Sequence, residues 1–438
     1  MKCPTCGQIC RTNRESCALC GTPFPKKRSR GGLLFALLVI VALALAGLIL
    51  WLLLQPPQPA ESPERAAQPE LQAQTPAPTP RADALFADAA QIWVRDSYIL
   101  ALRSDGTLAL AGQSASPEFG FDLYDWSNIV QLIPEDYFII ALNGDGRVRM
   151  TGEVSGYEEA ARWTDLRQLC WSAGSLFGLT GDGRVLVAGP GKEELESRAA
   201  ALGPVTELRP YFCDTLAVTE DGLVHVLPKL AMLTDAEGMT GLKDVQLNAD
   251  YALYLMEDGT VRLNEAQRQS LQAYGMDDPT AQLRDVEQIV LGDYGGYALL
   301  RDGHVAAIPG FVGTELPDVS GWENVTELVL DKERFVLYAL TADGRVLSAS
   351  PTEGEAPDLS AWENVVELQA NWYYVVARTA DGRVLVHTRE MAPAVFDTAD
   401  WDGVTAIALG SRNLAALRAD GAVLATGDNS CGQLSPAP

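Results

Sequence analysis

Short stretches of alternating apolar and polar residues recur along most of the chain, and each stretch contains an Asp-Gly pair. Nine such pairs occur at spacings of 37 to 44 residues, with their glycines at Gly106, Gly146, Gly183, Gly222, Gly259, Gly303, Gly344, Gly382 and Gly421. An Asp-Gly pair between alternating apolar residues favours a tight β-hairpin turn, because that turn needs positive φ. The pattern therefore predicts nine hairpins.

Apolar residues at fixed distances from each glycine extend every hairpin to a three-stranded unit. A valine or leucine follows the glycine by two residues, and an apolar residue precedes it by fourteen in all nine units. One meander cannot bury its inner face, so neighbouring units must stack. We expect an all-β fold over residues 84–438, a β-propeller of about seven to nine three- to four-stranded blades. A β-solenoid and a pair of barrels are the alternatives.

The last unit contains a recognisable sequence motif. Its residues "LRADGAVLATGDNSCGQLS" (Leu417–Ser435) resemble the regulator-of-chromosome-condensation repeat in its compact bacterial form. Five units, the last one included, keep a tryptophan at the start of the unit, namely Trp126, Trp163, Trp322, Trp362 and Trp401. The resemblance implies a propeller fold for residues 84–438. It leaves the function open, because propellers of this family act as exchange factors, chromatin binders or protein inhibitors.

Residues 1–25 carry two Cys-x-x-Cys pairs, Cys3 with Cys6 and Cys17 with Cys20, and a glycine follows each pair. Two such turns can hold one Zn²⁺ with four thiolates. The segment resembles the short zinc-ribbon family, and metal binding would contribute ~10–16 kcal/mol to its folding. We expect a structural zinc ribbon. Cys10 is an alternative ligand, and a redox dithiol is the alternative function.

Residues 31–54 contain no charged side chain. Twenty-four apolar or small residues can cross a hydrocarbon core ~30 Å thick as a helix. Basic residues crowd the N-terminal side of this segment at Lys26, Lys27, Arg28 and Arg30. The positive-inside rule then predicts a single-pass protein of the cell membrane with its N-terminus in the cytoplasm and its propeller outside.

Residues 55–83 are rich in proline, with eight prolines among Gln, Ala, Glu and Thr. This composition cannot build a core and favours extended polyproline II structure. We expect a disordered, semi-rigid linker between the membrane and the propeller.

The charge of −25 is unevenly distributed. Residues 1–30 hold seven of the 33 basic residues and one of the 58 acidic residues, so the rest of the chain has 26 basic and 57 acidic residues, a balance of −31. A domain of this charge is repelled by phosphate backbones, so we expect no nucleic acid to bind the propeller.

Tyrosines and tryptophans lie about eight residues before many of the turn glycines. The candidate binding residues are Tyr98, Tyr137, Tyr251, Tyr294, Trp372 and Tyr373. Because these positions lie on equivalent loops, we expect them at one end of the propeller. Rigid aromatic rings beside carboxylates suit a protein or a cell-wall glycan. The alternative is that the rings wedge between blades.

The sequence contains no recognisable catalytic constellation. Its three histidines, His225, His304 and His387, belong to different units, and no nucleophile elbow, phosphate loop or dinucleotide fingerprint occurs. We expect a non-catalytic, membrane-anchored module that binds an extracytoplasmic protein or wall polymer. A sensor that couples an external ligand to a cytoplasmic partner of the zinc ribbon is the second hypothesis, and a glycan-processing enzyme is the third.

Overall fold

The computed structural model describes residues 86–113, 120–123, 125–211, 214–228, 232–248, 252–310 and 315–434. The expected zinc ribbon (1–25), membrane helix (31–54) and proline-rich linker (55–83) lie outside these ranges. No helix within the described ranges is both long and apolar enough to span a membrane.

The described residues form nine three-stranded antiparallel sheets, each a meander of three consecutive strands. Blades 1 to 3 contain β1 (Ala89–Val94), β2 (Tyr98–Arg103), β3 (Leu108–Gly112), β4 (Ile129–Pro134), β5 (Phe138–Asn143), β6 (Val148–Gly152), β7 (Leu166–Ser172), β8 (Ser175–Thr180) and β9 (Val185–Ala188). Blades 4 to 6 contain β10 (Val205–Pro210), β11 (Asp214–Thr219), β12 (Val224–Pro228), β13 (Leu242–Leu247), β14 (Ala252–Met256), β15 (Val261–Leu263), β16 (Val286–Gly292), β17 (Gly295–Leu300) and β18 (Val305–Pro309). Blades 7 to 9 contain β19 (Val325–Asp331), β20 (Val336–Thr341), β21 (Val346–Ala349), β22 (Val365–Ala370), β23 (Tyr374–Thr379), β24 (Val384–Thr388), β25 (Val404–Leu409), β26 (Asn413–Arg418) and β27 (Val423–Gly427). This arrangement confirms the predicted all-β meanders, with nine blades of three strands.

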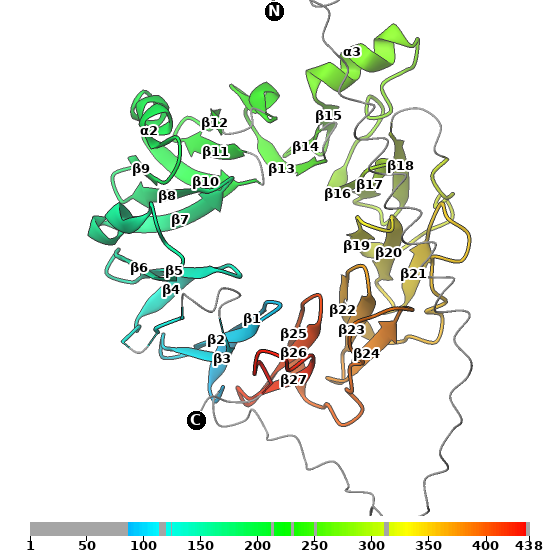
Figure 1. The fold of residues 1–438 in the computed structure, drawn as a ribbon. Helices are drawn as coiled ribbons and strands as arrows, with labels where there is room; N and C mark the ends of the chain where they lie inside the picture. Colours follow the sequence, from blue (N-terminus) through cyan, green and yellow to red (C-terminus); the bar gives the residue numbers. More distant parts are fainter. Residues whose placement is uncertain are drawn as a thin grey trace, which may run out of the picture. The chain divides into compact units, whose positions relative to one another are not determined.

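In the described parts of the connections between blades 2 and 6 there are four short helical segments: η2 (Glu158–Arg162), α2 (Lys192–Ala200), η3 (Thr234–Ala236) and α3 (Glu265–Ala273). They were not predicted. The two α-helices lie on the outside of the sheets (Figure 1). Leu195 and Ala199 of α2 belong to the apolar cluster between blades 3 and 4, so this helix widens an existing core.

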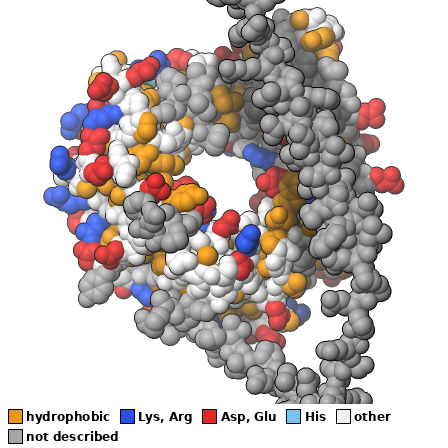
Figure 2. Space-filling model, viewed as in Figure 1, with side chains coloured by type: hydrophobic (Ala, Val, Ile, Leu, Met, Phe, Trp, Pro, Cys, Tyr) orange, Lys and Arg blue, Asp and Glu red, His pale blue; other side chains and the backbone are white. Residues whose placement is uncertain are grey.

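The buried apolar side chains of the described residues form nine clusters, one at each junction between neighbouring blades. The cluster that joins blade 1 to blade 9 contains Ile99 and Ala415, so the first and last sheets pack together and close a ring. A backbone hydrogen bond from Ala89 N to Gly421 O, 2.9 Å long, fixes the same junction. Figure 1 shows the ring, and Figure 2 shows the opening at its centre.

Eight of the nine Asp-Gly turns are hydrogen-bonded to the following blade, the exception being the turn of Gly222. Gly344 has φ +76°, and a Cβ atom there would lie 2.9 Å from the Cα atom of Asn364, which is itself left-handed at φ 58°. The amide of Val365 donates to the Gly344 carbonyl over 2.9 Å. The equivalent bond occurs at eight of the nine junctions formed by the described residues. The turn glycine is therefore needed both for its backbone angle and for the close approach of two blades.

The first strand of each sheet lies nearest the central opening, as Figure 1 shows for β7 and β25. Its inner edge has no partner strand and would leave backbone groups unpaired. Side-chain amides of the preceding blade cap this edge. Gln131 donates to Leu169 O over 2.7 Å and accepts from Leu169 N over 2.8 Å. The same reciprocal pair joins Gln168 to Leu208 and Gln288 to Leu328.

Candidate functional site

The loops between the first and second strands of the blades lie at one end of the ring, here called the loop end, because all nine sheets have the same topology. The Asp-Gly turns lie at the other end, the turn end. The loops of blades 7, 8, 9, 1 and 2 surround a hollow of about 780 Å³, here called the loop-end pocket. The side chains that give it its chemical character are Asp96, Glu135, Asp136, Glu333, Trp372 and Tyr373.

Trp372 forms an aromatic platform on the blade 8 side of the loop-end pocket. Its side chain is 40% exposed. The guanidinium carbon of Arg334 lies 4.9 Å from the ring centroid, so a cation–π contact covers one face of the ring. Arg334 is held in turn by Glu355, to which its Nη1 donates over 2.6 Å. The platform is therefore positioned before any ligand binds.

The loop that carries Trp372 is fixed by Asn371. The Asn371 side-chain oxygen accepts from the amides of Tyr373 and Tyr374, both over 3.0 Å. Its Nδ2 donates to Gly410 O of blade 9 over 2.9 Å. One short polar side chain thus shapes the loop and ties it to the next blade, which is the usual role of asparagine in a turn.

A buried ion pair holds the loops of blades 7 and 8 together. Arg389 Nη1 lies 3.0 Å from Asp331 Oδ2, and the two side chains are 7% and 1% exposed. Asp331 also accepts from the amide of Glu333 over 3.2 Å, and the amide of Arg389 donates to Tyr373 O over 2.9 Å. Arg389 further donates to the hydroxyl of Tyr338, and burial raises the pKa of that tyrosine to about 12. The pair therefore supports the wall of the pocket that contains Glu333 and Tyr373.

The pocket is strongly acidic. Four carboxylates and only one base, Arg95, are among its lining residues. The Arg95 Nε donates to Pro134 O over 2.7 Å. Burial raises the pKa of Glu135; Arg95 partly offsets this rise and the charge of Asp136 adds to it. The Oδ1 atom of Asp136 is buried and has no hydrogen-bond partner among the described residues. The site thus holds negative charge that its own residues do not neutralise.

Of the six predicted binding residues, Trp372 and Tyr373 line the pocket. Tyr137 and Tyr294 lie on other loops at the loop end and are 53% and 50% exposed. Tyr294 packs edge-on against Phe335, with ring centroids 5.3 Å apart. Tyr251 lies outside the described residues.

Tyr98 lies between two blades, which agrees with the alternative interpretation of the loop tyrosines. It is fully buried, and its hydroxyl donates to Glu135 O of blade 2 over 2.8 Å. Burial is also the main reason that the pKa of Tyr98 is raised. The ring is not accessible to a partner, so we correct its assignment from binding residue to spacer between blades 1 and 2.

A one-residue offset in the sequence separates the two kinds of tyrosine. Tyr98 and Tyr374 stand eight residues before their turn glycines, begin the middle strands and are fully buried. Tyr137 and Tyr294 stand nine residues before their glycines, at the tips of the loops. The earlier position is still in the loop, whereas the later one begins a middle strand whose consecutive residues are buried, so this offset separates exposed rings from buried ones. No signal in the sequence pointed to Arg334, Asp331 or Arg389. The last two are 58 residues apart, and no local pattern marks a contact over that separation.

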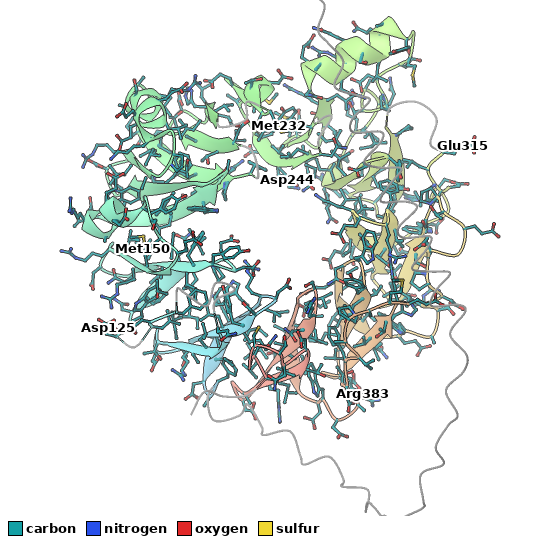
Figure 3. The ribbon with its side chains drawn as sticks, in the orientation of Figure 1. Asp125, Met150, Met232, Asp244, Glu315 and Arg383 are labelled. Atoms are coloured by element: carbon teal, nitrogen blue, oxygen red, sulfur yellow. The ribbon has the colours of Figure 1, made fainter. Side chains whose placement is uncertain are left out.

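A second hollow of about 690 Å³ lies between blades 4 and 5, and Tyr211, Asp244, Asn248 and Met232 line it. Asp244 lies at the edge of the central opening (Figure 3). Lys332 of blade 7 also reaches this hollow, whereas its neighbour Glu333 lines the loop-end pocket. Burial raises the pKa of Tyr211 to about 12, and the charge of Asp244 contributes.

The predicted zinc ligands Cys3, Cys6, Cys17 and Cys20 lie outside the described residues. Within the described ranges, no group of three or more His, Cys, Asp or Glu side chains is arranged to hold a metal ion. Cys170 is buried beside Thr215, and burial raises the pKa of its thiol to about 12.

Residues 404–433, which include all of blade 9, match the family described as the regulator of chromosome condensation (RCC1) repeat. The chain carries an RCC1-type repeat. This repeat and the nine three-stranded sheets show that the fold is a β-propeller, as the sequence predicted. No curated protein sequence matches the chain.

Three solved structures illustrate the similarity. The computationally designed Ika8 protein is 16% identical, with 69% of this chain and 97% of that chain covered and a TM-score of 0.38. BamB from Moraxella catarrhalis is 16% identical, with 77% and 96% covered and a TM-score of 0.35. Yeast RCC1 (Prp20), in its structure with Kap60, is 16% identical, with 67% and 75% covered and a TM-score of 0.33.

Proposed function

We propose that this protein is a non-catalytic binding module, anchored in the cell membrane, whose propeller captures an extracytoplasmic partner at its loop end. The observation that carries the proposal is the loop-end pocket, in which an exposed tryptophan and a tyrosine stand beside four carboxylates. Exposed aromatic rings on fixed loops are the residues that contribute most to binding energy at interfaces.

The supporting framework around the pocket agrees with this function. Arg334 holds one face of Trp372, Asn371 fixes its loop, and the buried pair of Asp331 and Arg389 joins two blades behind it. A binding surface held this way loses little conformational entropy when a partner arrives. The ring thus acts as a rigid carrier for loops that bind.

Site-specific photo-crosslinking in intact cells tests the proposal. A photoreactive residue at position 411, inside the pocket, is expected to crosslink a discrete partner, whereas the same residue at position 343, at the turn end, is not. Adding Trp372→Ala should abolish the crosslink from position 411 while the melting temperature of the purified chain stays unchanged. Equal crosslinking from both positions, or none from either, would contradict the proposal.

The membrane topology is part of the same proposal and rests on the uncharged segment 31–54 and the basic residues before it. Protease added outside intact cells should digest the propeller and leave residues 1–30 protected. Protection of the propeller would place it on the cytoplasmic side and overturn the topology.

A further inference from the structure

The surface beside the loop-end pocket is apolar. The connection from β24 to β25 carries Met391 and Val395, which are 91% and 81% exposed. This connection is held against the Trp372 loop, because Arg389 N donates to Tyr373 O and Ala394 N donates to the Tyr374 hydroxyl, over 2.9 and 3.1 Å. Ala392, Ala394 and Tyr373 pack against the same apolar cluster. Exposed Trp372, Met391 and Val395 and half-buried Tyr373 thus belong to two loops of blade 8 that are hydrogen-bonded to each other, and they are here called the blade 8 surface.

The loop-end pocket next to this surface has a net negative charge, because four carboxylates and one base, Arg95, line it. Within the described part of the chain, none of Asp96, Glu135, Asp136 and Glu333 forms an ion pair with a lysine, arginine or histidine. Asp136 also leaves a buried oxygen without a donor, and burial raises the pKa of Glu135. A concave site lined by one sign of charge attracts ligands of the opposite sign.

We infer that the occupant of this face is a segment of a partner protein in which a lysine or arginine follows or precedes an apolar side chain. The inference rests on the proposed binding function and specifies its partner. The basic group would enter the loop-end pocket and satisfy its carboxylates, and the apolar side chain would lie on the blade 8 surface. Charge complementarity and exposed Met and aromatic residues are both typical of protein interfaces.

A glycan fits these features less well. A neutral sugar could stack on Trp372 and donate hydrogen bonds from its hydroxyl groups to the carboxylates, but it offers no positive charge to these four groups. Its hydroxyl groups also gain nothing from the exposed aliphatic side chains of Met391 and Val395, whereas an apolar side chain of a protein does. The combination of acidic pocket and aliphatic surface therefore favours a protein.

Fluorescence anisotropy with three labelled peptides tests the inference on the purified full chain. The probes are repeats of Gly-Lys-Leu, which has charge and apolar side chains, of Gly-Lys-Ser, which has only charge, and of Gly-Glu-Leu, which has the opposite charge. We expect the Gly-Lys-Leu peptide to bind at least about tenfold more tightly than either of the others. Calorimetry with a neutral tetramer of N-acetylglucosamine provides the comparison with a glycan.

Two matched pairs of substitutions separate specific binding from general attraction to an acidic protein. Asp136→Asn with Glu333→Gln removes two charges inside the pocket, and Glu323→Gln with Glu363→Gln removes two exposed charges at the turn end. The pocket pair should weaken the Gly-Lys-Leu peptide about tenfold or more, and the turn-end pair should change its affinity by less than about twofold. Met391→Ser, on an exposed side chain, should weaken the Gly-Lys-Leu peptide but leave Gly-Lys-Ser unchanged.

The outcomes are distinguishable. Equal weakening by both pairs, or equal binding of Gly-Lys-Leu and Gly-Lys-Ser, would overturn the inference, because attraction would then be general. Binding of the neutral tetramer that is lost in Trp372→Ala would also overturn it, yet would keep the proposed function with a glycan as partner. Insensitivity of all probes to Trp372→Ala, together with no crosslink from position 411, would overturn both.

Discussion

Arg389 and Asp331 lie 58 residues apart in the sequence, yet their side chains form an almost fully buried ion pair with Nη1 and Oδ2 separated by 3.0 Å. The pair connects the residue that follows β24 to the end of β19, across the junction of blades 7 and 8. It also supports two loops of the loop-end pocket through backbone hydrogen bonds to Glu333 and Tyr373.

Replacing one partner of this pair should therefore be costly. Arg389→Ala leaves the Asp331 carboxylate buried without its counter-charge, and we expect the free energy of unfolding to fall by about 3–5 kcal/mol. Urea denaturation followed by tryptophan fluorescence measures the loss. Arg345→Ala is the control, since Arg345 pairs with Asp343 in an exposed turn, and it should leave the transition unchanged. Similar losses in both variants would show that the buried pair has no special structural role.

The Asp-Gly turns offer a second test with an internal control. Gly344 and Gly222 have nearly the same φ, +76° and +79°, but an added Cβ would strike blade 8 at Gly344 and would meet nothing within 4 Å at Gly222. Gly222→Ala should cost about 1 kcal/mol through backbone strain alone. Gly344→Ala should cost about 1–2 kcal/mol more, because two blades must move apart. Equal losses of unfolding free energy would mean that the close approach of the blades contributes nothing.

The amide caps of the inner strands can be tested locally. Gln131→Ala removes both hydrogen bonds to Leu169, so we expect a loss of about 1–2 kcal/mol and faster hydrogen exchange at the Leu169 amide. Gln91 occupies the same register position in blade 1 but is exposed, and Gln91→Ala should change neither quantity. Unchanged exchange at Leu169 would show that water replaces the cap without loss.

Glu135 should reveal a conflict between stability and binding. Its pKa is raised, mainly by burial, so the folded protein holds a proton there more readily than the unfolded chain does. The ionised carboxylate therefore lowers stability at pH values above its raised pKa, and this effect disappears as the pH falls below the unfolded value. Glu135→Gln should raise the melting temperature at neutral pH and leave it unchanged near pH 3 to 4, which is below the ordinary glutamate pKa.

The same variant should weaken binding of the Gly-Lys-Leu peptide, because it removes a pocket charge. Calorimetry across this pH range and anisotropy at neutral pH check the two effects. A lower melting temperature of Glu135→Gln at neutral pH would mean that ionised Glu135 stabilises the fold, which is the opposite of the effect expected from its raised pKa.

Metal analysis tests the predicted zinc ribbon. The full chain should contain one zinc ion, and Cys3→Ser with Cys17→Ser should remove it without changing the melting temperature of the propeller. Cys10→Ser is the matched control and should keep the metal if Cys10 is not a ligand. Zinc content that survives the loss of Cys3 and Cys17 would overturn the assignment of the four ligands.

The strands and turns were predictable because their signals are local. The Asp-Gly pairs and the apolar residues around them define hairpins within about twenty residues, and blades built this way have to stack. The site was less predictable. Trp372 and Tyr373 lie where their loop position suggested, but Tyr98 differs from Tyr137 by one position relative to the turn glycine, and that single step decides burial. The helix α2 was missed because its packing partners, at the junction of blades 3 and 4, are not visible in its own sequence.

The packing of blade 1 against blade 9, in the cluster that contains Ile99 and Ala415, has a consequence for biogenesis. Until the final repeat has been synthesised, the growing polypeptide is an open arc whose two end sheets each expose an apolar flank to water. Only the meeting of Ala89 with Gly421 conceals both flanks at once. A truncation that omits the last repeat should therefore yield an aggregation-prone product instead of a smaller soluble domain, since closure depends on the part that is made last.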